Sequence, residues 1–418
     1  MHVVISGCNA NPDFSDAHIA LTSELIAFWH GLFLLPVWGY FLLVLGLTHI
    51  TIVAVTLFLH RDQAHRGLRL NPLVRHFFRF WLWLTTGMNT REWVAVHRKH
   101  HATCETCDDP HSPAVSGIRT VLWAGVKLYK EETAREETLR RYGSGTPDDF
   151  LERHLYTRRR NIGIILLLLT QLVLFGLPGV AIWAIQMMWI PFFAAGVING
   201  VGHWFGYRSF ATDDLSTNIV NIGILIGGEE MHNNHHAYPS SARFSMRWWE
   251  FDIGWMYIRL LRMLRMAKVL QQAPRLRLRR AKTQIDQETM QALIASRITI
   301  MGQYARKVLL PTLRAEMRSA TGHYLPGLKR LRKMLPTLEH RLTPLDHDQL
   351  QQLLSQCPRL REVIRYQQRL QEIIRARNEG YRIMRTRLDE WCVEAEQTGI
   401  AGLQQFARRL CRYSLRPA

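Results

Sequence analysis

The chain has 418 residues, enough for two or three domains, and its 53 Lys and Arg outweigh 34 Asp and Glu to give a net charge of +19. In a soluble protein this excess would suggest nucleic acid, but here the basic residues crowd the segments that flank apolar stretches, as they do beside membrane spans. The sequence also lacks zinc-finger, basic-zipper and RNA-binding signatures, so we expect membrane lipid and no nucleic acid among its partners.

The N-terminal half contains the first apolar segments. Residues 1–25 are predicted to be a loose leader. They lack a basic stretch followed directly by an apolar core, so we expect no cleaved signal peptide. After Pro36, residues 37–59 are long enough to cross the hydrocarbon layer, which needs about 20 residues. Residues 73–89 are shorter and carry Arg75 and Arg79, which favours an interfacial or re-entrant helix.

Two further apolar runs follow a helix start. Thr146, followed by Pro147 and two acids, predicts the N-terminus of a helix that ends near residues 158–160. Residues 162–177 and 180–201 then flank Pro178 and Gly179, which predicts a transmembrane hairpin with its turn at that dipeptide. The chain would thus return to the side of the membrane that it left.

The sequence changes character after about Ala267, where it becomes polar, basic and rich in Arg, Gln and Leu. Apolar residues recur there at helical spacing and predict a soluble helical extension. They are Leu293, Ile298, Met301, Tyr304, Val308, Leu353, Cys357, Leu360, Ile364, Leu370, Ile373, Tyr381, Met384, Leu388 and Trp391. We therefore predict an all-α membrane protein, a transmembrane helical bundle with a histidine-rich cap and this C-terminal extension.

Histidines gather in three clusters beside the apolar segments: HRDQAH (His60, His65), HRKHH (His97, His100, His101) and HNNHH (His232, His235, His236). His203 stands apart, four residues after Asn199. Residues three or four apart share a helix face, so each of the last two clusters should project together, as should Asn199 and His203. His60 and His65 are five apart, about 140° around an α-helix, and converge only if the helix ends between them.

Such a set of imidazoles predicts a metal centre, because burying them without a shared partner would be costly. They exceed the four ligands of a closed zinc site, which favours two ions, and imidazole-rich open sites suit iron, which can activate dioxygen. Asp109, Glu229 and Glu230 are expected to accept the second ring N–H of a ligand. His30, His49 and His76 have no second ligand at suitable spacing and are expected to be packed or hydrogen-bonded side chains.

The three clusters resemble the eight-histidine signature of membrane fatty acid desaturases. Asn199 to His203, followed by WFGYR, is similar to the segment that supplies a ninth histidine in the delta-9 (stearoyl-CoA desaturase-like) group, and Glu92-Trp93 and Asp109-Pro110-His111 fit the same group. The string GGEEMHNNHH is similar to the bacterial branch. The resemblance covers about residues 36–265.

This resemblance implies that nine histidines hold two iron ions, with Asn199 touching one through water. Dioxygen and two electrons would remove hydrogen from C9 and then C10 of a saturated acyl chain, which gives a cis double bond and water. Acyl-CoA-using animal members have Asp where this chain has Val96, so acyl-CoA, phospholipid and acyl carrier all stay open as the substrate's carrier. Since the cytochrome b5 signature HPGG is missing, a separate ferredoxin or cytochrome b5-type protein with its reductase would donate the electrons.

The resulting organisation has a leader at residues 1–25, a membrane desaturase domain at 26–267 and the extension at 268–418, with metal site and C-terminus on the cytoplasmic side of a multi-pass inner-membrane protein. If the extension is only an appendage, truncation after Ala267 should spare iron binding. One alternative is a membrane di-iron hydroxylase or monooxygenase of lipids or alkanes, which would give hydroxylated products. The other is a non-enzymatic membrane metal-binding protein, which would leave lipids unchanged.

Overall fold

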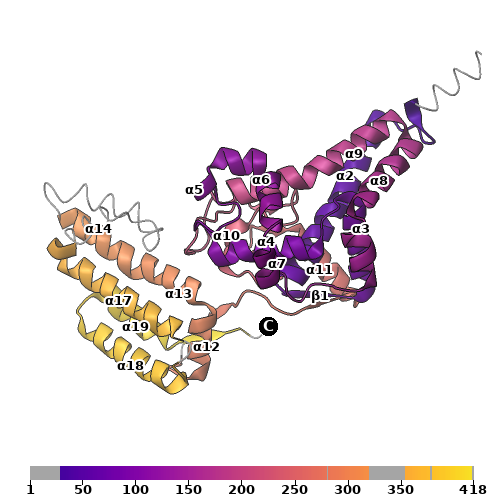
Figure 1. Ribbon diagram of the computed structural model, residues 1–418. Coiled ribbons are helices and arrows are strands. Elements are labelled where there is room, and N and C mark those ends of the chain that lie inside the picture. The colour runs from indigo at the N-terminus through magenta and orange to yellow at the C-terminus, as the bar shows by residue number, and fades with distance from the viewer. Residues whose placement is uncertain (1–28, 280, 320–353, 377–378, 417–418) are drawn as a thin grey trace, which may run out of the picture. The chain divides into compact units, whose positions relative to one another are not determined.

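The computed structural model describes residues 29–279, 281–319, 354–376 and 379–416, and these are mostly helical (Figure 1). The described chain divides into two compact units. The first comprises residues up to 200, 224–228 and 256–268, and the second comprises 201–223, 229–255 and 269–418. The second unit thus joins the extension to segments that carry part of the histidine motifs. The predicted leader lies outside the described residues.

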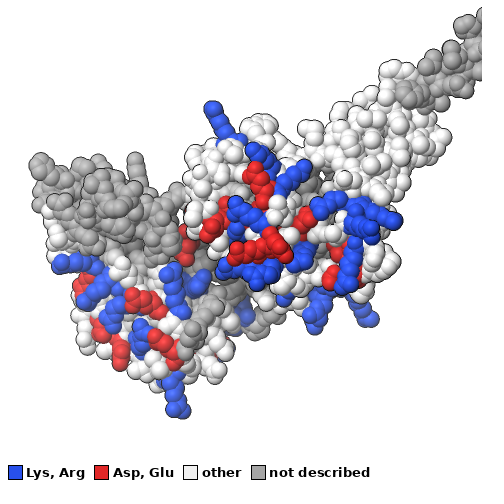
Figure 2. Space-filling model, viewed as in Figure 1, with Lys and Arg blue, Asp and Glu red and all other residues white. Residues whose placement is uncertain are grey.

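Two helices of the first unit are long and apolar enough to cross a membrane. One is formed by α2 (Val37–Ala54) and its π-helical continuation η1 (Val55–Ala64), and the other by α9 (Leu177–Ile190) and the π-helix η3 (Pro191–Val201). A shorter apolar helix, α8 (Arg160–Phe175), precedes α9. In Figure 2 the arm that contains α2, α8 and α9, at the upper right, is almost free of Lys, Arg, Asp and Glu on the visible face.

The predicted hairpin is present, but its turn lies earlier than expected. Trp183 on α9 donates its indole N–H to Ile164 O on α8 at 3.2 Å, so the two helices lie side by side (Figure 1). The chain reverses at Gly176, whose φ of 62° suits glycine, and not at Pro178 and Gly179. Pro178 falls in the first turn of α9, where the missing N–H has no helical partner to lose.

The predicted helix over residues 73–89 is α3 (Pro72–Thr85), which Asn71 caps by accepting from Leu73 N at 2.8 Å. One face exposes Leu73 and Phe77. Its two arginines are paired, Arg75 with Asp62 at 2.7 Å and Arg79 with Asp149 at 2.6 Å. Salt bridges within the protein therefore accommodate the charges of this otherwise apolar helix.

The helix predicted to start at Thr146 begins later, at Phe150. Asp149 is its cap and accepts from Glu152 N at 2.9 Å, while the Thr146 hydroxyl donates to Gly143 O instead. Arg79 holds the Asp149 carboxylate in this place, a contact between distant segments that local sequence does not reveal. The helix continues as η2 (Glu152–Thr157) and ends near residue 158, as predicted.

The rest of the first unit surrounds these helices. Its elements are β1 (Leu68–Leu70), α4 (Thr90–Thr103), α5 (Pro113–Ser116), α6 (Ile118–Thr133), α7 (Glu136–Tyr142), most of α11 (Ile253–Met263), and β4 (Ala267–Val269), which pairs with β1. His49 on α2 lies 2.8 Å from the Tyr257 hydroxyl on α11, which confirms that His49 is a hydrogen-bonded side chain.

The second unit contains β2 (Ile222–Gly223) and β3 (Phe251–Asp252), which pair in parallel, and the short helix α10 (His232–Ala237). The extension follows as β5 (Leu276–Leu278), α12 (Gln287–Ala295), α13 (Arg297–Tyr304), η4 (Ala305–Leu309), α14 (Leu310–Ser319), α17 (Pro358–Arg375), α18 (Tyr381–Gln397), α19 (Ala401–Leu410) and β6 (Tyr413–Leu415). Strands β5 and β6 pair antiparallel.

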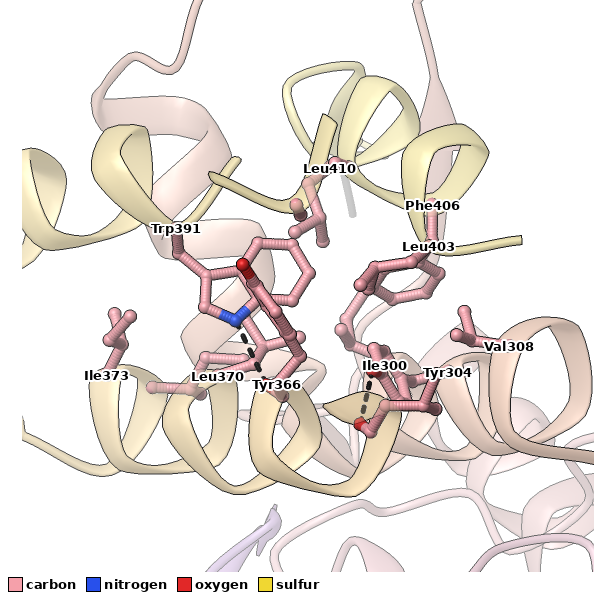
Figure 3. Packing of buried hydrophobic residues seen from close by; sticks show 14 of the residues in the cluster. Ile300, Tyr304, Val308, Tyr366, Leu370, Ile373, Trp391, Leu403, Phe406 and Leu410 are labelled. Atoms are coloured by element: carbon pink, nitrogen blue, oxygen red, sulfur yellow. Dashed lines mark hydrogen bonds between the residues drawn. The ribbon is translucent and has the colours of Figure 1, made fainter. Parts of the chain in front are cut away.

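The helices of the extension enclose a hydrophobic core, as their spacing predicted (Figure 3). Trp391 is fully buried and donates its indole N–H to Tyr366 O at 3.0 Å, and the Tyr304 hydroxyl donates to Val363 O at 2.7 Å. Ile300 occupies the core where Ile298 was expected, because α12 ends at Ala295 and the new helix α13 shifts the register. Tyr381 also differs from the prediction, because it is 40% exposed. Leu353 lies outside the described residues.

Truncation of the Trp391 side chain should destabilise the core of the extension. Trp391→Ala removes a fully buried side chain and its hydrogen bond, so we expect a loss of about 3–5 kcal/mol in the free energy of opening. Amide hydrogen exchange of α17 and α18 in the full-length protein measures it. The control Tyr381→Ala, at an exposed position of the same helix, should change that free energy by less than about 0.5 kcal/mol; equal effects would contradict the assigned core.

Candidate metal centre

The first unit gathers four imidazoles, here called the first imidazole group: His60, His65, His97 and His101. One ligand nitrogen of each lies within 4.8 Å of those of the others. The Nε2 atoms of His65 and His97 are 2.7 Å apart, and the ring centroids of His60 and His97 are 4.4 Å apart. His97 and His101 lie four residues apart on α4 and therefore share one face of that helix.

A π-turn brings His60 and His65 together. The amide of His65 donates to His60 O at 3.0 Å, an i→i+5 bond that places the later residue over the earlier one, and the ring centroids are 4.9 Å apart. The helix ends at Ala64, between the two histidines as predicted, but this segment is π-helical, and the i→i+5 bond brings the two rings together. The 3.6-residue period of the α-helix does not apply to this segment.

Arg98, which sequence reasoning did not single out, fastens this turn to α4. Its guanidinium donates to Gln63 O at 2.8 Å and Ala64 O at 2.9 Å, the last carbonyls of η1, and to Tyr142 O and Ser144 O at 3.0 and 2.8 Å. These carbonyls would otherwise lack partners at a helix end. One residue of the second cluster thus fixes the backbone directly before His65.

The prediction that His97, His100 and His101 project together is only partly confirmed. All three lie on α4, but His100 departs from the first imidazole group and places Nδ1 2.9 Å from Asp109 Oδ1. Asp109 also accepts from Glu105 N at 2.7 Å and His111 N at 3.1 Å. The carboxylate that the sequence suggested as a support for a ligand therefore supports His100.

Electrostatics at this support favour the ionised carboxylate. Burial alone would raise the pKa of Asp109, but the adjacent His100 and the N–H groups that donate to the carboxylate hold that pKa below the ordinary range. An ionised Asp109 accepts a hydrogen bond from Nδ1–H of His100. The Nε2 atom of the neutral ring then keeps its lone pair for a metal ion. Trp93 meanwhile stacks on His97 with ring centroids 4.9 Å apart, which limits rotation of that ring.

The second unit gathers three imidazoles, the second imidazole group: His203, His232 and His236. Their ligand atoms also lie within 4.8 Å of one another, and the Nε2 atoms of His203 and His232 are 3.0 Å apart. His203 is 2% exposed and follows the end of η3 at Val201, so the shared helix face expected for it and Asn199 does not extend to it. Asn199 itself is half-buried on η3, and its role as a ligand through water stays a prediction.

A carboxylate missed by sequence reasoning supports this group. Asp214 Oδ2 lies 2.9 Å from His236 Nδ1, and its Oδ1 accepts from Thr212 Oγ1 at 2.7 Å and Ser216 N at 3.0 Å. Burial alone would raise the pKa of Asp214, but His236 holds it well below the ordinary range. Asp214 lies 22 residues before His236, and no periodic spacing relates the two. Glu229 and Glu230 are buried, and their predicted support of a ligand stays a prediction.

The two asparagines of the HNNHH motif hold α10 in place. Asn233 Oδ1 accepts from Ser209 N and Phe210 N at 2.9 Å, and Asn234 Nδ2 donates to Glu250 Oε2 at 2.8 Å. Both asparagines are fully buried. The motif therefore alternates candidate ligands with residues that attach a short helix to the segments before and after it.

The donor set fits a transition metal. The two groups consist of imidazoles, which in the neutral form are the commonest protein ligands of such ions, and a cation can accept lone pairs from several of them at once. His100 and His236 each have a carboxylate at Nδ1, the arrangement that fixes the tautomer of a metal-binding histidine. His235 directly precedes His236 on α10, and its ring centroid lies 4.8 Å from that of Phe244.

Comparison with known proteins agrees with this chemistry. A model of the fatty acid desaturase family matches residues 32–269, and a transposase model matches residues 300–415, less than a third of the chain. An acyl-CoA 5-desaturase of Anemone leveillei is 32% identical over 58% of this chain and 70% of its own length. An sn-1 stearoyl-lipid 9-desaturase of Synechocystis is 32% identical, with 53% and 68% covered, and delta-9 acyl-lipid desaturase 1 of Arabidopsis thaliana is 29% identical, with 51% and 70% covered.

The desaturase model spans more than half of the chain and includes all three histidine clusters, His203, and the carboxylates that hold His100 and His236. The chain therefore belongs to the fatty acid desaturase family, and it is an oxidoreductase that desaturates acyl chains.

Proposed function

We propose that the protein is a dioxygen-dependent delta-9 desaturase that introduces a cis double bond into a saturated acyl chain, with two iron ions held by nine histidines. The observation that carries the proposal is the pair of imidazole groups, with carboxylates at His100 and His236. Relatives named as 9-desaturases support the position of the double bond. The GGEEMHNNHH string is the reason to assign the bacterial branch.

The histidines are proposed as metal ligands, and two carboxylates are proposed to orient them. The first and second imidazole groups, with His100 and His235, would hold the ions, and Asn199 would contact one of them through water. Bound iron would supply the activation of dioxygen, for which two electrons are needed. Asp109 and Asp214 accept hydrogen bonds from Nδ1–H of His100 and His236, so that Nε2 of each ring would keep its lone pair for a metal ion.

The carrier and the electron donor are proposed only as classes. The relatives are named as acyl-CoA and as stearoyl-lipid desaturases, so both carriers remain candidates, and acyl carrier protein does as well. A separate ferredoxin or cytochrome b5-type protein with its reductase would donate electrons. The absence of nucleic acid among the partners stays a prediction.

We further propose a multi-pass protein of the inner membrane whose metal site and C-terminus face the cytoplasm. The two long apolar helices support membrane insertion, as does the arm in Figure 2, whose visible face is almost free of charged residues. The exposed apolar residues of α8, Ile162, Ile165, Leu166, Leu169 and Val173, support the hairpin as a further part of the bundle.

Product analysis tests the reaction. A bacterial host expressing the full chain should accumulate cis-9 unsaturated fatty acids that an empty-vector host lacks, as measured by gas chromatography and mass spectrometry of fatty acid methyl esters. Hydroxylated chains would indicate a hydroxylase instead, and unchanged lipids would indicate a metal-binding protein without this activity. Double bonds at another carbon would refute the delta-9 assignment alone.

Removal of one ligand should separate metal binding from membrane insertion. His100→Ala and His235→Ala should each abolish new double bonds and lower the iron content, while the amount of protein in the membrane fraction stays unchanged. Iron analysis of the purified variants and fatty acid analysis of the host are the measurements. His30→Phe is the control and should be nearly silent; full activity of either alanine variant would remove that histidine from the ligands.

The support of His100 can be tested separately from the ligand itself. Asp109→Asn keeps the size of the side chain but removes the charged acceptor, so we expect iron affinity to fall about 10- to 100-fold. Competition with a chelator measures the affinity. Asp108→Asn, at the exposed neighbouring position, should leave it unchanged; an equal loss in both variants would mean that the loop and not the Asp109–His100 contact matters.

A further inference from the structure

None of the candidate ligands lies in the extension, whose two ends meet each other. β5 at its start pairs with β6 at its end, with Leu276 opposite Leu415, and Arg416 N donates to Arg275 O at 2.9 Å. Together with its own core, this pairing closes the extension into a folded body that begins shortly after the desaturase segment.

One contact joins the extension to the helix that carries three histidines. Tyr238 ends α10, where its amide donates to His235 O at 3.1 Å. Its hydroxyl lies 2.7 Å from Thr299 Oγ1 on α13. The residue that terminates the ligand helix is thus bonded directly to a helix of the extension.

The segment that enters the extension adds two backbone contacts. Ala242 N donates to Gln271 O, and Ala273 N donates to Ser241 Oγ, both at 3.0 Å. Ser241 and Ala242 are buried, so these bonds are shielded from water. The chain just after α10 is therefore held along the chain that leads to β5.

A third link reaches the carboxylate loop of the second imidazole group. Arg375, the last residue of α17, places Nη2 3.3 Å from Asp213 Oδ2. Asp213 directly precedes Asp214, which holds His236. Both partners are about half exposed, so this ion pair is weak by itself and acts together with the other contacts.

We infer that the extension is a positioning element for the third histidine cluster, an inference that rests on the proposed iron site. Helix α10 has six residues, too few for a helix to be stable alone, so its neighbours must fix its geometry. Asn233 and Asn234 attach the helix to the desaturase segments, and Tyr238, Thr299, Asp213 and Arg375 attach its far end and its carboxylate loop to the extension. This argues against the expectation that truncation after Ala267 spares iron binding.

The test uses the full-length protein with Thr299→Val and Arg375→Glu, singly and together. Loss of one such contact changes an equilibrium constant about two- to five-fold, so the double variant should shift it about 4- to 25-fold. Two measurements apply: iron retention against a chelator, and hydrogen exchange of the amides of residues 232–238 in the metal-free protein. In the double variant, iron should be lost to the chelator more readily and the amides of residues 232–238 should exchange faster. The amides of α17 and α18 should keep their protection from exchange.

Two controls separate positioning from general stability. Arg369→Glu breaks the Arg369–Glu394 pair, which lies wholly inside the extension, and should change neither measurement. Asp213→Arg combined with Arg375→Glu restores opposite charges and should recover the single-variant loss. Wild-type exchange and iron retention in the double variant would overturn the inference, as would an equal effect of Arg369→Glu. A wild-type protein without iron would instead refute the proposed function, and the exchange arm would still test the positioning.

Discussion

The hydrogen bond from the His65 amide to His60 O sets the geometry of the first imidazole group. An α-helix would separate these two side chains by about 140°, whereas the i→i+5 bond brings their ring centroids to 4.9 Å. π-Turns are rare and need support from neighbouring structure. Here Arg98 supplies it by binding Gln63 O and Ala64 O, so the second cluster stabilises the register of the first.

Two of the histidines, His100 and His236, each have a carboxylate at Nδ1. Asp109 and Asp214 are themselves held by backbone N–H donors, at Glu105 and Ser216 respectively, so each carboxylate is fixed before it orients a ring. A buried, ionised carboxylate is unfavourable alone, and the adjacent imidazole lowers its pKa enough to keep it charged. Ligand orientation and carboxylate ionisation therefore depend on each other.

Local sequence predicted what local physics determines. The spacing of apolar residues predicted the helices and most of the core of the extension, and Asp109 was found because it lies in the turn directly after α4. The features that the sequence did not reveal have a common cause. The cap at Asp149 depends on Arg79, the support of His236 depends on a residue in a distant loop, and the π-turn at His60 breaks the period on which helical reasoning relies. Each is set by contacts between segments that pattern alone does not connect.

The family matches divide the chain at residues 269 and 300, as though it consisted of two independent modules. The contacts within the second unit suggest an asymmetric dependence. The extension has a buried core of its own around Trp391 and Tyr304, so its helices pack without help from the histidine segments. Helix α10 has no such core, and the side chains of its Asn233 and Asn234 attach it to Phe210 N and to Glu250 in the segments on either side. We therefore expect the stability of α10, which carries the third histidine cluster, to depend on the extension, so the limits of the family matches need not be the limits of the candidate site.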